Sequence, residues 1–226
     1  MSCIQRSIDR SFIPFDGPRK VWPRFIKLVV VNLIDDPDLA PPLGDALKRG
    51  GLPVAEVTFR TPAAVEALRA LATDTEIVVG AGTVVRPEQV DWARDAGASF
   101  VVTPGFSGRV LERCREVGMP LLPGIATPSE VIAALDSGID LVKFFPAEAS
   151  GGVAMVRALG APFPNVRFVP TGGISSSNAP AYLSLAAVAA VGGSWIVDSE
   201  LIRARNFAAV ERLAREAVAM ATAARS

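Results

Sequence analysis

The feature that most constrains the fold is an alternation of short apolar runs, rich in β-branched residues, with longer stretches that carry Ala, Leu, Glu and Arg at helical spacing. This alternation is typical of repeated βα units. Apolar residues predominate in these runs, as expected for parallel strands that helices cover on both faces. The sequence predicts eight strands, over residues 26–32, 54–58, 77–79, 100–102, 120–122, 141–144, 166–169 and 188–191.

Helix boundaries between these runs are marked by a capping residue or proline in front and by glycine behind. The first helix is expected from about Pro41 and the last over 206–223. Three others are predicted from Arg86 to Gly97, from Ser107 to Gly118 and from Thr127 to Gly138.

Eight βα units without a linker favour one closed (β/α)8 TIM barrel over a doubly wound open sheet, which has about five to seven strands. We therefore predict an α/β protein with a single barrel domain over residues 25–226. Residues 1–24 contain several prolines and are interpreted as an irregular N-terminal arm.

Composition excludes several classes of function. The chain has 226 residues, with 23 Lys and Arg against 23 Asp and Glu, so charge-driven binding to nucleic acid or membrane is not expected. The absence of histidine excludes Ser-His-Asp catalysis and His-ligated metals, and two cysteines are too few for a thiolate cage. No metal and no cofactor are predicted. Because no long apolar run occurs, neither a signal peptide nor a membrane-spanning helix is predicted, and a cytoplasmic location is expected.

Polar residues at the ends of apolar runs are the candidate site, because barrel active sites lie at the carboxyl ends of the strands. Four residues have this position: Glu56, Arg60, Thr83 and Lys143. An ionisable side chain inside an apolar strand must be paired or neutralised, since burying an isolated charge is costly.

Lys143 lies between Val142 and Phe144. Desolvation there would disfavour its ammonium form and leave an amine able to form a Schiff base with a ketone. The alternative is a lysine whose stem packs in the strand while its head reaches solvent. Glu56 is then the candidate proton carrier, because no histidine is available; its alternative role is a structural salt bridge to Lys143 or Arg60.

Two glycine pairs indicate a phosphate site. Thr171-Gly172-Gly173 follows the seventh predicted strand, and Gly192-Gly193-Ser194 follows the eighth. The loops after these strands are the recurrent phosphate site of such barrels, and glycine lets backbone N–H groups approach an anion. Either pair alone would be a weak signal, better explained by a turn.

Seven strings in this order resemble the 2-keto-3-deoxy-6-phosphogluconate (KDPG) aldolase and 4-hydroxy-2-oxoglutarate aldolase family. They are EVTFRT from Glu56, VGAGTV from Val79, TPGF from Thr103, PLLPGIATPSE from Pro120, KFFPAE from Lys143, PTGGIS from Pro170 and GGSW from Gly192. The resemblance covers roughly residues 26–220. It implies a class I aldolase, a lyase that cleaves KDPG to pyruvate and glyceraldehyde 3-phosphate. It also implies a homotrimer and a place in the Entner–Doudoroff pathway of carbohydrate metabolism.

Residue roles follow from the resemblance by position. Lys143 resembles the Schiff-base lysine and Glu56 the general acid/base. The substrate-binding residues implied are Arg60, Thr83, Pro104, Phe145 and Thr171, and the phosphate-binding residues implied are Gly172, Gly173, Gly193 and Ser194. The alternatives are an aldolase acting mainly on 4-hydroxy-2-oxoglutarate or on the phosphogalactonate analogue, a phosphate-binding isomerase or synthase, and a non-catalytic barrel that binds a sugar phosphate.

Overall fold

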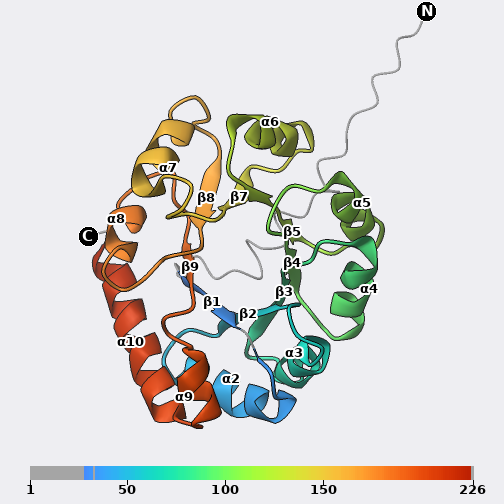
Figure 1. Ribbon diagram of the computed structural model, residues 1–226, viewed down its shortest axis with the longest axis vertical. Helices are drawn as coiled ribbons and strands as arrows, with labels where there is room; N and C mark the ends of the chain where they lie inside the picture. Colours follow the sequence, from blue (N-terminus) through green and yellow to red (C-terminus); the bar gives the residue numbers. More distant parts are fainter. Residues whose placement is uncertain (1–27, 33, 225–226) are drawn as a thin grey trace, which may run out of the picture.

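The computed structural model describes residues 28–32 and 34–224. The predicted arm, residues 1–24, therefore lies outside the described residues. Parallel strands lie at the centre and helices surround them, which confirms the predicted α/β class (Figure 1). The strands are β1 (Leu28–Asn32), β2 (Val54–Thr58), β3 (Val78–Gly82), β4 (Phe100–Val102), β5 (Leu121–Leu122), β6 (Gly124–Ile125), β7 (Leu141–Phe144), β8 (Arg167–Pro170) and β9 (Val191–Gly193).

The strands form two curled parallel sheets. One has the order β5-β4-β3-β2-β1-β9 and the other the order β6-β7-β8. β5 and β6 follow one another on either side of Pro123, and the Pro123 carbonyl accepts a hydrogen bond of 2.8 Å from the Lys143 amide. Isolated parallel bridges join Phe168 to Val188 and Thr171 to Gly192, next to β8 and β9.

Four predicted strands have different bounds in the structure, and one of them, expected over 166–169, differs only by a shift of one residue to Arg167–Pro170. The strand expected over 120–122 is β5, and the ladder resumes as β6 only after Pro123, which has no N–H to donate. The strand expected over 77–79 is β3, which continues to Gly82. Glycine disfavours strands, but here the Phe100 ring fills the space beside Gly80. The strand expected over 188–191 begins only at Val191.

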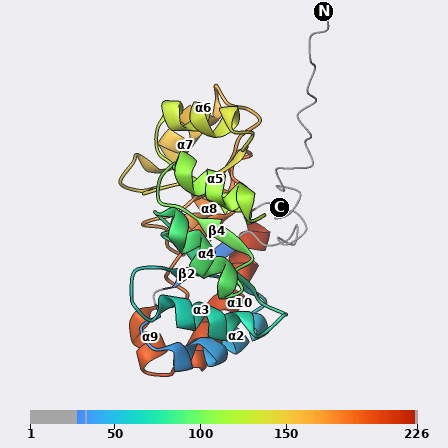
Figure 2. The same cartoon turned by 90° about the vertical axis from the view of Figure 1, so that its right-hand side faces the viewer.

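The helices follow the predicted capping signals. Ser107 accepts a hydrogen bond from the Val110 amide, and Thr127 forms a capping box with Glu130. The helices are the 3-10 turn η2 (Pro37–Leu39), α2 (Ala40–Arg49), α3 (Ala64–Ala72), α4 (Pro87–Asp95), α5 (Gly108–Glu116), α6 (Pro128–Asp136), α7 (Gly152–Gly160), α8 (Ala179–Leu183), α9 (Ser199–Arg203) and α10 (Phe207–Ala223). Figure 2 shows α3, α4, α5 and α6 following one another along one side. None of the described helices is long and apolar enough to cross a bilayer.

The core has two parts, because the side chains of a strand alternate between its faces. The larger cluster packs the strands against the helices. The smaller one lies on the opposite face and consists of Val29, Val54, Phe100, Val102, Leu122, Val169 and Ala190. Glu56 is two residues beyond Val54 and Thr171 is two beyond Val169, so their positions share the face of the smaller cluster. Polar groups therefore follow this apolar layer toward the carboxyl ends of the strands.

Candidate active site

Lys143 of β7 and Glu56 of β2 form a buried ion pair. Lys143 Nζ lies 3.3 Å from Glu56 Oε1, although 87 positions separate the two residues in the sequence. Their side chains are only 6% and 3% exposed. The lysine head is therefore buried, and the alternative interpretation, in which it reaches solvent, is wrong. A proton can pass between the amine and the carboxylate within this contact, so the pair can act as a nucleophile with its own proton acceptor.

Two neighbours shape the surroundings of this pair. The ring of Phe145 lies 5.2 Å from Lys143 Nζ, measured to the ring centroid. Gly82, at the end of β3, leaves room for the carboxylate: a Cβ at this position would lie 2.2 Å from Glu56 Oε1. Gly82 belongs to the VGAGTV string, but nothing in the sequence alone indicates this contact.

Arg60 and Thr83 follow the neighbouring strands β2 and β3. The Arg60 side chain is exposed and forms no ion pair with any described residue, so it is not the partner of Glu56. Thr83 has φ of 58°, a left-handed conformation that is rare for a β-branched residue and typical of strained functional positions. Both residues lie at the strand end where the ion pair lies.

Pro104 follows β4 and packs against β6. A Cβ on Gly124 would lie 2.3 Å from the Pro104 carbonyl carbon, so only glycine allows this approach. The buried Thr103 hydroxyl accepts a hydrogen bond of 3.2 Å from the Gly124 amide and ties the two segments together. Pro104 thus has a fixed position after β4.

The two predicted phosphate loops are adjacent, because Thr171 is bridged to Gly192. A Cβ on Gly192 would lie 2.4 Å from Thr171 Oγ1, so the loops are in close contact. Gly172 and Gly173 have φ of 97° and 77°, which glycine adopts without strain. Gly193 is buried against the Trp195 ring, and Ser194 is exposed immediately after it.

Three residues beside these loops were not assigned a role from the sequence: Glu148, Asn178 and Tyr182. Asn178 accepts a hydrogen bond from the Ser175 amide and donates one to the Gly173 carbonyl. Tyr182 donates to Glu148 Oε1. One signal was available, because a tyrosine in an otherwise apolar helical segment needs a partner for its hydroxyl once it is buried.

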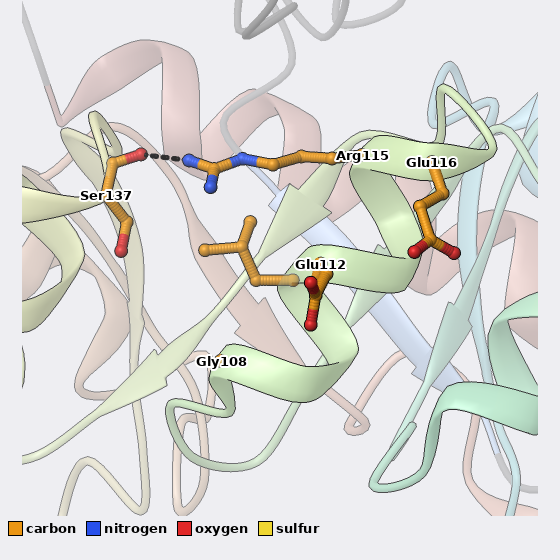
Figure 3. A pocket seen from close by; sticks show the side chains of 6 residues that line it. Gly108, Glu112, Arg115, Glu116 and Ser137 are labelled. Carbon is orange, nitrogen blue, oxygen red and sulfur yellow. Dashed lines mark hydrogen bonds between the residues drawn. The ribbon is translucent and has the colours of Figure 1, made fainter.

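A surface pocket of about 630 Å³ lies elsewhere, between α5 and α6 (Figure 3). Arg115 spans it and donates a hydrogen bond of 2.7 Å to the Ser137 carbonyl. None of the predicted site residues belongs to its lining, which consists of Gly108, Leu111, Glu112, Arg115, Glu116 and Ser137. The pocket therefore does not bring together the predicted chemistry.

The described residues also include a free thiol, that of Cys114, which is buried in α5. Burial raises the pKa of its thiol to about 12, so it stays protonated near neutral pH. Cys114 is therefore an apolar core residue rather than a reactive one.

Several known proteins that are similar to this chain are aldolases. Residues 22–213 match the model of the family described as KDPG and KHG aldolase. A KHG/KDPG aldolase of Escherichia coli is 45% identical over 194 residues, which are 85% of this chain and 90% of the relative.

Two solved structures are also similar. A KDPG aldolase of Legionella pneumophila with pyruvate captured as a covalent carbinolamine has a TM-score of 0.83 and 42% identity, over 85% of this chain and 94% of that one. The 2-keto-3-deoxy-6-phosphogluconate aldolase of Zymomonas mobilis with 3-phosphoglycerate has a TM-score of 0.81 and 40% identity, over 87% and 93%. The chain thus belongs to the KDPG and KHG aldolase family.

Proposed function

We propose that this protein is a class I aldolase that reversibly cleaves KDPG to pyruvate and glyceraldehyde 3-phosphate. The observation that carries the proposal is the buried contact of 3.3 Å between Lys143 Nζ and Glu56 Oε1. It supplies an amine and a proton carrier in a chain without histidine. The identity of 42% to an enzyme captured with a pyruvate carbinolamine supports the same chemistry.

The reaction begins when the Lys143 amine, having passed its proton to Glu56, attacks the C2 ketone of the substrate. Glu56 returns this proton to the carbinolamine oxygen and then carries a second proton from the attacking nitrogen to the same oxygen, so that water leaves and a protonated iminium forms. Glu56 then accepts the proton of the C4 hydroxyl, through a water molecule. The C3–C4 bond breaks, its electron pair flows into the iminium to give an enamine, and the aldehyde leaves. Protonation of C3 and hydrolysis release pyruvate and the free amine.

The pyruvyl carboxylate is assigned to Arg60 and Thr83, at the ends of β2 and β3. A guanidinium offers a planar fork of donors that suits a carboxylate, and the exposed Arg60 head forms no ion pair within the described chain. Phe145 and Pro104 are assigned to the wall around the reacting carbons. The Thr171 hydroxyl is assigned to the hydroxyl of the aldehyde half.

The phosphate is assigned to Gly172, Gly173, Gly193 and Ser194. The bridge between Thr171 and Gly192 places both loops together, which supports one shared anion site. The relative with 3-phosphoglycerate supports a phosphorylated substrate. The name of the Escherichia coli relative supports 4-hydroxy-2-oxoglutarate as a second substrate.

The wider setting of the enzyme is part of this proposal. We infer that the two sheets close into one eight-stranded barrel, with β5 and β6 as one strand. The β8–β9 bridges and the hydrogen bond from Lys143 to Pro123 support closure. A homotrimer, a cytoplasmic location and the Entner–Doudoroff pathway are carried over from the family resemblance. Light scattering of the purified protein tests the trimer.

Covalent trapping tests the mechanism. Pyruvate with borohydride should reduce the iminium and attach a three-carbon adduct to the peptide that contains Lys143. Lys143→Arg keeps the positive charge but supplies no free amine, since a guanidinium has a pKa above about 12. This variant should lose both labelling and pyruvate release while its circular dichroism and melting curve stay close to those of the wild type.

Lys48→Arg is the matched control. Lys48 forms ion pairs with Asp45, Asp74 and Glu76, away from β7, so an arginine can replace it there. Labelling and turnover should be unchanged in this variant. Full activity in Lys143→Arg, or an adduct on another lysine, would refute the mechanism.

A further inference from the structure

The glutamate that ends the KFFPAE string has no role in the mechanism above, yet it lies directly beneath one of the proposed phosphate loops. A Cβ on Gly173 would lie 2.6 Å from Glu148 Cγ and 2.7 Å from Glu148 Cβ. The Glu148 amide also donates a hydrogen bond of 3.1 Å to the Gly172 carbonyl. The side chain of Glu148 therefore forms the surface on which the Gly172–Gly173 turn rests.

Tyr182 fixes that surface from the opposite side. It is fully buried in α8, and its hydroxyl donates to Glu148 Oε1. Burial raises the pKa of Tyr182, and the hydrogen bond to Glu148 raises it further. The phenol therefore remains a donor at neutral pH. The position of a Cβ on Gly152 would lie 3.4 Å from both Glu148 Oε1 and the Tyr182 hydroxyl oxygen, so a third segment encloses the pair.

The other end of the turn is held separately. Asn178 Nδ2 donates a hydrogen bond of 2.9 Å to the Gly173 carbonyl. Throughout the described ranges, by contrast, no protein acceptor is found for the Gly173 amide. With both glycines at positive φ and the Gly173 carbonyl fixed by Asn178, the direction of this amide depends on Glu148 below it.

We propose that Glu148 and Tyr182 are positioning residues that hold the Gly172–Gly173 turn so that its backbone amides can bind the substrate phosphate. This inference rests on the phosphate site assigned under the proposed function. The hydroxyl of Tyr182 has a second effect, because its hydrogen bond to Glu148 Oε1 offsets part of the negative charge of this carboxylate. A carboxylate beside a phosphate would otherwise weaken binding by repulsion.

Three substitutions test the pair. Tyr182→Phe removes only the hydroxyl and keeps the buried ring. Glu148→Ala removes both the acceptor and the packing surface. Glu148→Gln keeps the shape and an oxygen that can accept from Tyr182. Tyr182→Phe and Glu148→Ala should raise KM for KDPG by up to about tenfold, the value expected for one lost hydrogen bond. Glu148→Gln should have a KM close to that of the wild type.

The comparison substrate is 4-hydroxy-2-oxoglutarate, which undergoes the same bond cleavage but carries no phosphate. Its KM and kcat should stay within about twofold of the wild type in all three variants, because this substrate has no phosphate for the Gly172–Gly173 turn to bind. Ser184→Ala is the matched control: it deletes a hydroxyl from the end of the same helix, where Ser184 bonds the Ala181 carbonyl. It should leave both substrates unaffected.

Calorimetric titration with inorganic phosphate supplies a readout that needs no turnover. The affinity for phosphate should fall in Tyr182→Phe and Glu148→Ala and recover in Glu148→Gln. Equal effects on the two substrates, or unchanged phosphate affinity in Tyr182→Phe, would overturn the positioning role. Absence of pyruvate release by the wild type would instead count against the proposed function, and the phosphate titration would still decide the inference.

Discussion

The Glu56 side chain on β2 reaches diagonally toward Gly82 on β3, so closely that a Cβ on residue 82 would lie 2.2 Å from Glu56 Oε1 and 2.6 Å from its Cγ. The carboxylate reaches Lys143 through space that only glycine leaves open. The backbone of Gly82 is not in the left-handed region, so the requirement for glycine here is one of volume.

Gly82→Ala should therefore displace the Glu56 carboxylate from Lys143. We expect kcat/KM for pyruvate release to fall by about 100-fold, the effect of a catalytic group misplaced by about 1 Å. Gly108→Ala is the control, because a Cβ there meets nothing within 4 Å. Wild-type kinetics in Gly82→Ala would show that the carboxylate position is not critical.

Strained backbone at Thr83 leads to a second prediction. Replacing it with glycine relieves a left-handed conformation that costs about 1–2 kcal/mol, against about 0.5–1 kcal/mol for the greater freedom of unfolded glycine. Thr83→Gly should keep or slightly raise the free energy of unfolding in urea while KM for the substrate rises. Thr73→Gly, at φ of −66°, should lower stability instead. Equal destabilisation by both changes would contradict the strain at Thr83.

The sequence was sufficient for the elements and residues whose signals are local. The pairing of the buried Lys143 and Glu56 side chains could be predicted because each is an ionisable residue inside an apolar strand. The caps at Ser107 and Thr127 could be predicted because the motif is complete within four residues. The interruption of the strand at Pro123 was not predicted, because the sequence pattern of Pro120–Leu122 is that of an ordinary strand end. Contacts such as Tyr182 with Glu148 join residues 34 positions apart, and only the packed structure shows them.

Stability in acid should depend on the ion pair between α4 and α5. Arg113 donates two hydrogen bonds to Asp91 Oδ1, of 2.7 and 3.2 Å, and one of 3.1 Å to Oδ2, and it lowers the pKa of Asp91 below its ordinary value of 3.8. A depressed folded-state pKa adds stability that is complete above the unfolded value and is lost as pH falls through the folded value. The melting temperature of Asp91→Asn should therefore lie below that of the wild type near pH 7. The gap should close at pH values below about 3.8. A gap that persists unchanged in acid would exclude this origin.

The Schiff-base mechanism predicts that catalysis does not need a metal ion. The iminium of Lys143 serves as the electron sink, so no Lewis acid is needed to stabilise the enamine. The chain also has no histidine to ligate a divalent ion. Activity should survive prolonged dialysis against EDTA. Loss of pyruvate release that returns only on addition of a divalent ion would disprove the Schiff-base assignment.

Ser194 should distinguish the two substrates. It is exposed directly after Gly193, whose backbone is fixed beneath the Trp195 ring: a Cβ on Gly193 would lie 1.8 Å from that ring. If its hydroxyl donates to the phosphate, Ser194→Ala loses one charge-assisted hydrogen bond, about 1.5–3 kcal/mol, and KM for KDPG should rise by about tenfold or more.

The KM for 4-hydroxy-2-oxoglutarate should not change in this variant, because that substrate has no phosphate for Ser194 to bind. Ser137→Ala is the control: it removes a serine hydroxyl at the end of α6, where Ser137 donates to the Ala133 carbonyl. Steady-state kinetics on both substrates measure the effect. If Ser194→Ala raises KM by the same factor for both substrates, the phosphate lies away from the loop after β9. If KM rises only for KDPG, Ser194 is a residue that discriminates the phosphorylated substrate.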